Sequence, residues 1–262
     1  MDFSDKTRIA PDVIARILGN PREIGLDPAD LADKNPEQQK ALIEGECLAM
    51  LASQAGYQAV QRLRASGHAS PDWFDHRFHL LIPEEECLDF WTASADNVVF
   101  KLPMGGKVLD LCSGDGFYDY WFFRRRASEI VCVDIGPKAH RQAVRLHGGP
   151  GIVHHHANVL AWVPPAGHFD VVVCRGAIEH FSQANQQVIF RKAYEALKSG
   201  GWFCGDTPAN PKENRKMLSA HENEWADANE MRAELAQVFP VIETSTLVSK
   251  QRTTLFWRAQ RP

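Results

Sequence analysis

The 262-residue sequence lacks the features of membrane-spanning, disulfide-stabilised and nucleic-acid-binding proteins. No apolar run approaches the ~20 residues of a membrane helix, and the N-terminal residues form no signal-peptide core. The 6 cysteines include no Cys-x-x-Cys pair, which argues against a zinc site and a disulfide framework. The net charge of -4 offers no basic surface for nucleic acid. We therefore expect a cytoplasmic protein without a nucleic-acid or membrane partner.

A strand followed by a glycine turn stands near the middle of the sequence. The run Lys107–Leu111 is β-prone, Gly114 and Gly116 follow it, and Phe117–Arg126 has the spacing of an amphipathic helix. In such a turn, glycines permit positive φ angles and let a ligand approach the first N–H groups of the helix. A second strand, Ile130–Asp134, ends on a carboxylate that can accept hydrogen bonds from ribose hydroxyls. The pattern indicates a binding site for a nucleotide-type cofactor.

The turn lacks the third glycine of the dinucleotide-binding fingerprint Gly-x-Gly-x-x-Gly. Asp119 stands in its place, and Asp110 and Asp115 add two carboxylates around the same turn. Negative charge there disfavours a pyrophosphate and favours a cationic ligand. S-adenosylmethionine carries sulfonium and ammonium groups and no phosphate, so it suits the turn better than NAD does. A nicotinamide oxidoreductase is therefore the disfavoured alternative.

These residues resemble the first motif of class I S-adenosylmethionine-dependent methyltransferases. That motif places an acidic residue before Gly-x-Gly-x-Gly, and Asp110–Gly116 matches it except that Cys112 replaces the first glycine. The resemblance extends from about Lys101 to the C-terminus, and it implies S-adenosylmethionine as the cofactor. The segment His156–Trp162 resembles the family's third landmark. The cofactor-binding residues implied in this way are Asp110, Cys112, Gly114, Gly116, Asp134, Ile135, Asn158 and Val159.

The segment Phe169–Phe181 resembles the fourth motif of the same family, a buried strand that runs into a loop. The resemblance places His180 near the transferred methyl group, where an imidazole that titrates near neutrality could act as the general base. The alternative is that His180 only packs or caps the loop. Arg175, at the end of the strand, is assigned to the cofactor site and could also pair with an acidic substrate.

The C-terminal part supplies the remaining elements of this fold. We expect a helix over about Asn185–Leu197, a strand over Trp202–Asp206 and a helix over about Asn229–Phe239. Two β-rich runs, Val241–Val248 and Thr253–Arg258, would form an antiparallel edge hairpin. The expected fold class is α/β: a Rossmann-like class I methyltransferase sheet, mostly parallel, with an antiparallel C-terminal edge hairpin and flanking helices.

Residues 1–100 exceed what a cofactor-binding core over residues 101–262 requires. Helical patterns occur over Pro11–Leu18, from Pro36 to about Ala65, and over Glu84–Val99. We expect an N-terminal helical extension that acts as a lid over the methyl-donor site, excludes water and positions the acceptor. The candidate substrate-binding residues are Trp73, His76, His79, Tyr118 and His221.

The consecutive residues His154, His155 and His156 do not predict a metal site. Neighbouring strand residues point to opposite faces, so three rings in a row cannot converge on one ion. We therefore expect no bound metal in this chain.

The expected activity is the in-line transfer of a methyl group from S-adenosylmethionine to an oxygen or nitrogen nucleophile of a small molecule. The sequence lacks the Asn/Asp-Pro-Pro-Tyr/Phe motif of amino-group DNA methyltransferases and has Cys174–Ala177 at that position. Two alternatives stay open: methylation of a macromolecule such as tRNA or protein, and cofactor binding without catalysis. We also allow for a homodimer.

Overall fold

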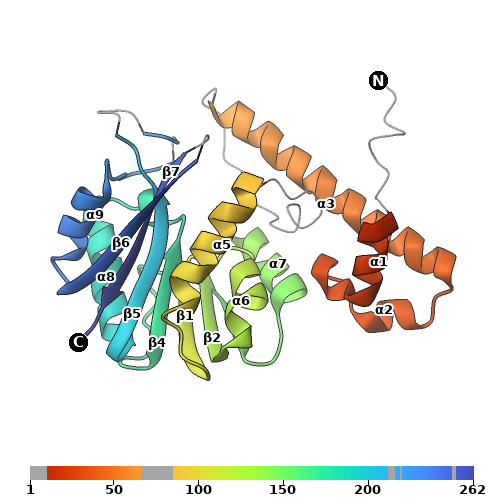
Figure 1. Cartoon of the computed structure of the whole chain (residues 1–262), viewed down its shortest axis with the longest axis horizontal. Helices are drawn as coiled ribbons and strands as arrows, with labels where there is room; N and C mark the ends of the chain where they lie inside the picture. The colour runs from red at the N-terminus through yellow and green to blue at the C-terminus, as the bar shows by residue number, and fades with distance from the viewer. Residues whose placement is uncertain (1–10, 66–84, 212–215, 219, 250–251) are drawn as a thin grey trace.

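The computed structural model describes residues 11–65, 85–211, 216–218, 220–249 and 252–262. Figure 1 shows a twisted sheet with helices packed on it, and a group of N-terminal helices beside it. None of the described helices combines the length and the apolar character needed to cross a lipid bilayer.

Seven strands form one sheet in the order β3-β2-β1-β4-β5-β7-β6. The first five lie parallel, whereas β7 runs antiparallel between β5 and β6. The strand order reverses between β1 and β4, so the carboxyl ends of these two strands border the crevice where ligands bind in such sheets. This topology confirms the predicted fold class. The strands are β1 (Gly106–Leu111), β2 (Ala127–Asp134), β3 (Ile152–His156), β4 (Phe169–Arg175), β5 (Leu197–Pro208), β6 (Val241–Val248) and β7 (Thr253–Gln260).

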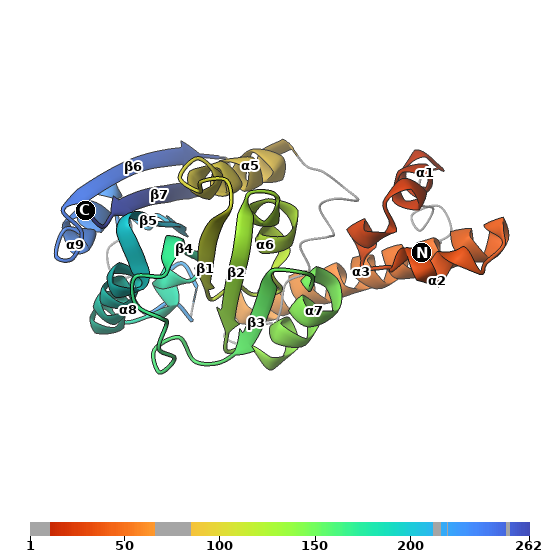
Figure 2. The same ribbon diagram turned by 90° about the horizontal axis from the view of Figure 1, so that it is seen from below.

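Alternate strand residues fill two apolar layers, one on each face of the sheet. Val171 and Val173 of β4 lie in one layer, and Val172 and Cys174 lie in the other. Figure 2 shows the helices divided between the two faces in the same way. The first face carries α5 (Glu85–Val99), α6 (Phe117–Trp121) and α7 (Pro137–His147), and the second carries α8 (Gln183–Ala196) and α9 (Ala228–Leu235). Strands covered on both faces have near-continuous apolar sequences, as β4 does.

Two elements end or begin elsewhere than the sequence patterns predict. Helix α6 ends at Trp121, and the chain continues as the 3-10 turn η2 (Phe123–Arg125). This shorter path buries Phe123 and returns the chain to β2, so tertiary packing overrides the helical pattern. Strand β5 begins at Leu197, which pairs with Phe169 of β4, whereas the sequence predicts a strand only from Trp202.

The N-terminal helices have an apolar core of their own. The elements that share this core are α1 (Pro11–Gly19), η1 (Pro21–Ile24), α2 (Pro28–Ala32) and α3 (Pro36–Ala65). Helix α3 begins at the predicted proline. The Asn35 side chain accepts the Gln38 N–H at 3.0 Å, and the Gln38 side chain accepts the Asn35 N–H at 3.1 Å. This reciprocal cap satisfies two donors at the start of the helix.

Helix α5 is attached to the sheet by buried polar contacts. Ser94 Oγ donates to Asp206 Oδ2 on β5 at 2.6 Å. Asn97 Nδ2 donates to the carbonyl oxygens of Gly205 at 3.0 Å and Trp257 at 3.2 Å. By these contacts α5 packs on the sheet, whereas the predicted division after residue 100 places it in the N-terminal extension.

Replacing Asn97 with Ala is expected to lower the free energy of unfolding by about 1–3 kcal/mol, because it removes hydrogen bonds from a buried helix–sheet contact. Thr92→Ala is the matched control, since Thr92 is exposed on the same helix, and it should change stability by less than ~0.5 kcal/mol. Urea denaturation measures both. Equal effects of the two substitutions would show that Asn97 does not hold α5 on the sheet.

Candidate functional site

The turn after β1 has the backbone conformation that its glycines allow. Cys112, Gly114 and Gly116 have φ angles of 62°, 59° and 71°, all in the left-handed region. Among the described residues, Cys112 is the only non-glycine with a positive φ angle, and it stands where the family motif has glycine. Its N–H donates to the carbonyl oxygen of Val133 at 2.8 Å. The cofactor turn is therefore held against the end of β2.

Asp134 ties the glycine turn to the chain beyond β2. Its Oδ2 accepts the Gly114 N–H at 2.8 Å, and its Oδ1 accepts the Gly136 N–H at 2.6 Å. Burial raises the pKa of this carboxyl group, and the two N–H donors oppose the rise. A carboxylate has about four lone-pair sites, so Asp134 can still accept hydrogen bonds from two hydroxyl groups. The neighbouring Ile135 side chain is 64% exposed and offers an apolar surface to a flat ring.

Asn158 and Val159 follow β3 and lie beside the same edge of the sheet. The Ala157 N–H donates to the carbonyl oxygen of Asp134 at 2.9 Å, which brings the two segments together. Asn158 Oδ1 accepts the Leu160 N–H at 2.9 Å, and the Asn158 side chain is exposed. The Val159 side chain is buried in the core, so only its backbone could serve a ligand.

Two buried carboxyl groups adjoin the turn. Burial and the nearby charge of Asp119 hold the pKa of Asp110 well above its usual value. Burial also raises the pKa of Asp119 to about 6, although the Arg175 guanidinium opposes the rise. Arg175 Nη2 lies 4.0 Å from Asp110 Oδ2. A cation close to the two carboxyl groups would favour their charged forms.

Arg175 and Tyr118 lie differently from the sequence-based expectation. The Arg175 Cζ atom is 3.4 Å from the centroid of the Tyr118 ring, and the Tyr118 side chain is only 1% exposed. Arg175 therefore lies between the Tyr118 ring and the buried Asp110 carboxyl group. Neither side chain faces an open surface in this structure, and their roles toward a cofactor or an acceptor stay predictions.

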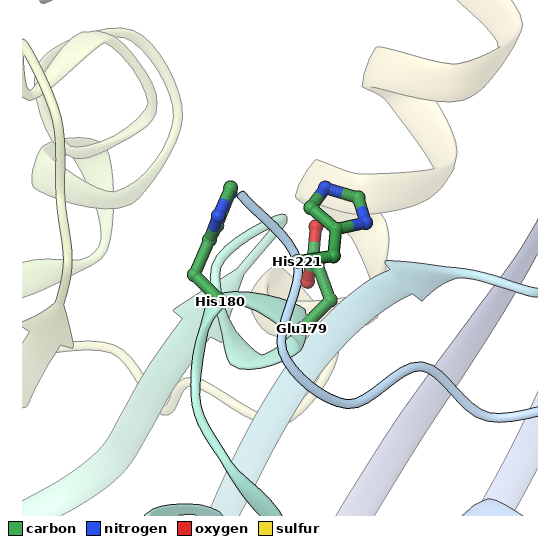
Figure 3. A group of neighbouring side chains, drawn as sticks. All are labelled: Glu179, His180 and His221. Atoms are coloured by element: carbon green, nitrogen blue, oxygen red, sulfur yellow. The ribbon is translucent and has the colours of Figure 1, made fainter. Parts of the chain in front are cut away.

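Three ionisable side chains meet beyond the carboxyl ends of β4 and β5 (Figure 3). Glu179 and His180 belong to the 3-10 turn η3 (Ile178–His180), and His221 belongs to the segment before α9. One carboxylate oxygen and one nitrogen from each ring lie within 4.8 Å of one another. The two rings meet edge to face, with centroids 4.7 Å apart. The sequence predicted both histidines for the site but missed Glu179.

Hydrogen bonds to both its side chain and its backbone hold Glu179 in place. Thr207 Oγ1 on β5 donates to Glu179 Oε2 at 2.9 Å. Burial raises the pKa of Glu179 to about 7. Its carbonyl oxygen accepts the N–H groups of Glu222 at 2.7 Å and Asn223 at 3.2 Å. These bonds join η3 to the segment that carries His221.

Each histidine of this group is oriented by a protein oxygen. His180 Nδ1 lies 3.1 Å from the carbonyl oxygen of Ala220, which can only accept, so Nδ1 carries the proton. His221 Nδ1 bonds to the Glu224 carboxylate. Burial opposes the ionisation of Glu224, yet hydrogen bonds led by the Met217 N–H hold its pKa below the usual value. No pattern in the sequence singled out Glu224.

The other predicted residues do not join this group. His154 Nε2 lies 3.3 Å from the His147 carbonyl oxygen and His156 Nε2 lies 3.0 Å from the Ile135 carbonyl oxygen, while the His155 ring packs near Trp162. The three consecutive rings therefore diverge, as strand alternation predicts. The predicted substrate-binding residues outside the described ranges are Trp73, His76 and His79.

Known proteins share the fold of the sheet domain. Residues 108–201 match a family model described as a methyltransferase domain. No curated protein sequence matches the chain. A putative S-adenosylmethionine-dependent methyltransferase from Listeria monocytogenes has a TM-score of 0.50 at 15% identity, and the match covers 65% of this chain and 100% of that one.

Two further structures extend the comparison. A Haemonchus contortus phosphoethanolamine N-methyltransferase 2, in complex with phosphomonomethylethanolamine and S-adenosylhomocysteine, has a TM-score of 0.57 at 14% identity, over 66% of this chain and 52% of that one. A possible exported protein from Bordetella parapertussis has a TM-score of 0.57 at 15% identity, over 100% of this chain and 99% of that one. At these identities, the likeness shows a common fold.

Gly116→Ala is expected to destabilise the protein more than Gly114→Ala. Both positions have positive φ angles, which cost a non-glycine residue about 1–3 kcal/mol. A Cβ atom at Gly116 would also lie 2.7 Å from His154 Cε1, whereas one at Gly114 would meet no described atom within 4 Å. Thermal unfolding of the two variants measures the difference. Indistinguishable melting temperatures would mean that the His154 ring moves aside at no cost.

Proposed function

We propose that this protein transfers a methyl group from S-adenosylmethionine to an oxygen or nitrogen atom of a small molecule, since its residues 108–201 match a model of a methyltransferase domain. The bound cofactor would supply an electrophilic methyl carbon. The observation that carries the proposal is the Asp134 carboxylate, fixed by two N–H donors beside the exposed Ile135 side chain. A carboxylate next to an apolar surface suits a ribose next to an adenine ring.

The buried acids beside the turn support a cofactor of positive charge. Asp110 and Asp119 both have raised pKa values because burial disfavours their charged forms. A sulfonium or ammonium group nearby would stabilise those charged forms, whereas a pyrophosphate would repel them. The charge preference of the site therefore agrees with S-adenosylmethionine and disagrees with NAD.

His180 is the residue that we expect to act on the proton of the acceptor. It is exposed at the carboxyl edge of the sheet, just beyond β4. Because its Nδ1 donates to the Ala220 carbonyl oxygen, Nε2 is the basic nitrogen of the neutral ring. An acceptor hydroxyl or ammonium group must lose its proton before or during methyl transfer, and a positioned imidazole can take it.

A small acceptor is supported by charge and by one structural relative. The net charge of -4 provides no basic excess for a nucleic acid. The Haemonchus contortus enzyme of the same fold is bound to phosphomonomethylethanolamine, a small amine. Methylation of tRNA or protein is the competing function. In an assay with labelled S-adenosylmethionine, it would appear as transfer of label to the macromolecule.

Calorimetric titration with S-adenosylhomocysteine and, in parallel, with NAD tests the cofactor assignment. We expect binding of S-adenosylhomocysteine alone. Asp134→Ala should weaken it by about 1.5–3 kcal/mol, or roughly 10- to 150-fold, because a charge-assisted hydrogen bond is lost. Glu129→Gln is the matched control, since Glu129 is a carboxylate near the opposite end of the same strand. Unchanged affinity in Asp134→Ala would remove this residue from the site.

His180→Ala is expected to lower turnover about a hundredfold or more while S-adenosylhomocysteine affinity is preserved. Transfer of labelled methyl groups to a panel of small alcohols, phenols and amines measures the turnover. His168→Ala, a histidine at the amino end of β4, serves as the control. Turnover that matches the wild type would assign His180 to packing alone.

A further inference from the structure

The group formed by Glu179, His180 and His221 has the composition of a metal-ligand set. Two imidazoles and one carboxylate bind catalytic zinc in other proteins, and imidazole nitrogen favours divalent transition metals over magnesium and calcium. The three ligand atoms lie within 4.8 Å of one another. A tetrahedral ion with bonds of about 2.1 Å would hold them about 3.4 Å apart. Small side-chain rotations would therefore close the group around an ion.

The surroundings of both imidazoles support this assignment. Metal-binding histidines almost always donate their second ring nitrogen to a carboxylate or a backbone carbonyl, which orients the ring. His221 Nδ1 bonds to the Glu224 carboxylate, and His180 Nδ1 donates to the Ala220 carbonyl oxygen. Both rings thus have the orienting contact that a metal ligand requires.

The charge and exposure of these three side chains agree with a catalytic metal ion. Glu179 is buried, and the nearby Asp206 carboxyl group adds negative potential that opposes its ionisation. A divalent ion would offset both the burial of the Glu179 carboxylate and its repulsion by Asp206. His180 is exposed, whereas Glu179 and His221 are buried, so one side of the group opens toward the edge of the sheet. Three protein ligands and an open side are typical of catalytic rather than structural metal sites.

We propose that Glu179, His180 and His221 bind a divalent transition-metal ion of the Zn²⁺ class, and that this ion takes a hydroxyl oxygen of the methyl acceptor as its next ligand. The metal site itself needs no cofactor, but the choice of a hydroxyl acceptor rests on the proposed function. The proposal replaces the expectation of a metal-free chain, which considered only the consecutive histidines of β3.

With the ion bound, His180 would no longer take the acceptor's proton itself. A hydroxyl group bound to a divalent cation has a lowered pKa, so its proton passes to solvent water near neutral pH. The oxygen then uses a lone pair to form the bond to the methyl carbon, and the broken carbon–sulfur bond leaves its electron pair on sulfur. In this arrangement His180 is a metal ligand, and the ion makes the oxygen nucleophilic.

Cobalt titration tests the site without cofactor or acceptor. Tag-free, full-length protein is freed of metal with a chelator and titrated with Co²⁺, whose visible absorption reports nitrogen and oxygen ligands, and then with competing Zn²⁺. We expect one Co²⁺ per chain, displaced by one Zn²⁺. Absence of stoichiometric binding would overturn the proposal.

Variants locate the ion. His180→Ala and His221→Ala should each weaken Co²⁺ binding at least a hundredfold, and Glu224→Gln should weaken it about 10- to 100-fold by freeing the His221 ring. His168→Ala should bind as the wild type does. His180 is exposed, so its variant remains informative even where loss of the buried His221 disturbs folding, which thermal unfolding without metal would reveal. Wild-type binding by both histidine variants would place the ion elsewhere and overturn the assignment.

A third measurement separates this proposal from the proposed function. The affinity for S-adenosylhomocysteine should be the same in metal-free protein and in His221→Ala as in the metal-loaded wild type, because the cofactor residues lie at β1, β2 and β3. Methyl transfer to hydroxyl acceptors should fall about a hundredfold after chelation and return with Zn²⁺ or Mn²⁺. Full transfer by metal-free protein would reject the metal site and leave the methyltransferase assignment intact. Cobalt binding without S-adenosylhomocysteine binding would reject the methyltransferase assignment and leave the metal site intact.

Discussion

The buried guanidinium of Arg175 is the interaction on which the carboxyl edge of the sheet depends. Burial opposes its charge, yet Asp110, Asp206 and Asp119 together raise the pKa of Arg175. These acids come from β1, β5 and α6, so one cation interacts electrostatically with groups on three elements. Removing one partner of a buried ion pair typically costs about 3–5 kcal/mol, because the remaining charge is left uncompensated. The charge balance therefore fixes how the cofactor turn sits against β4 and β5.

This arrangement divides the edge into two chemically different halves. The half formed by β1, β2 and β3 presents the Asp134 carboxylate, fixed by two backbone N–H groups, and an exposed isoleucine, which suit a nucleoside. The half formed by β4 and β5 presents Glu179, His180 and His221, which suit proton or metal chemistry. Asp206 of β5 links the two halves through Arg175, since it affects the pKa of Glu179 and of Arg175, and Arg175 lies 4.0 Å from Asp110 of β1. A methyl donor held by the first half would thus lie beside groups able to activate an acceptor.

The cofactor half could be predicted from the sequence because its constraints are local. Gly114 and Gly116 adopt positive φ angles that their own type permits, and Asp134 ends a strand whose apolar run is visible. The acceptor half depends on tertiary contacts that no periodicity records. His221 reaches Glu179 through backbone bonds from the segment beyond β5, and its partner Glu224 carries no motif. The contact between Arg175 and Tyr118 could not be predicted either, because it depends on how α6 packs against β4 and not on either residue's neighbours in the sequence.

Helix α5 is the described element before β1 that contacts the charged groups of the site. The core of α1, α2 and α3 is separate from the two cores of the sheet. Of the described residues before β1, those of α5 reach the site's charge network, since Ser94 donates to Asp206. Asn97 anchors the same helix to the backbone of β5 and β7. A shift of α5 would move the hydrogen-bond donor of Asp206, and with it the charge balance around Arg175 and Glu179.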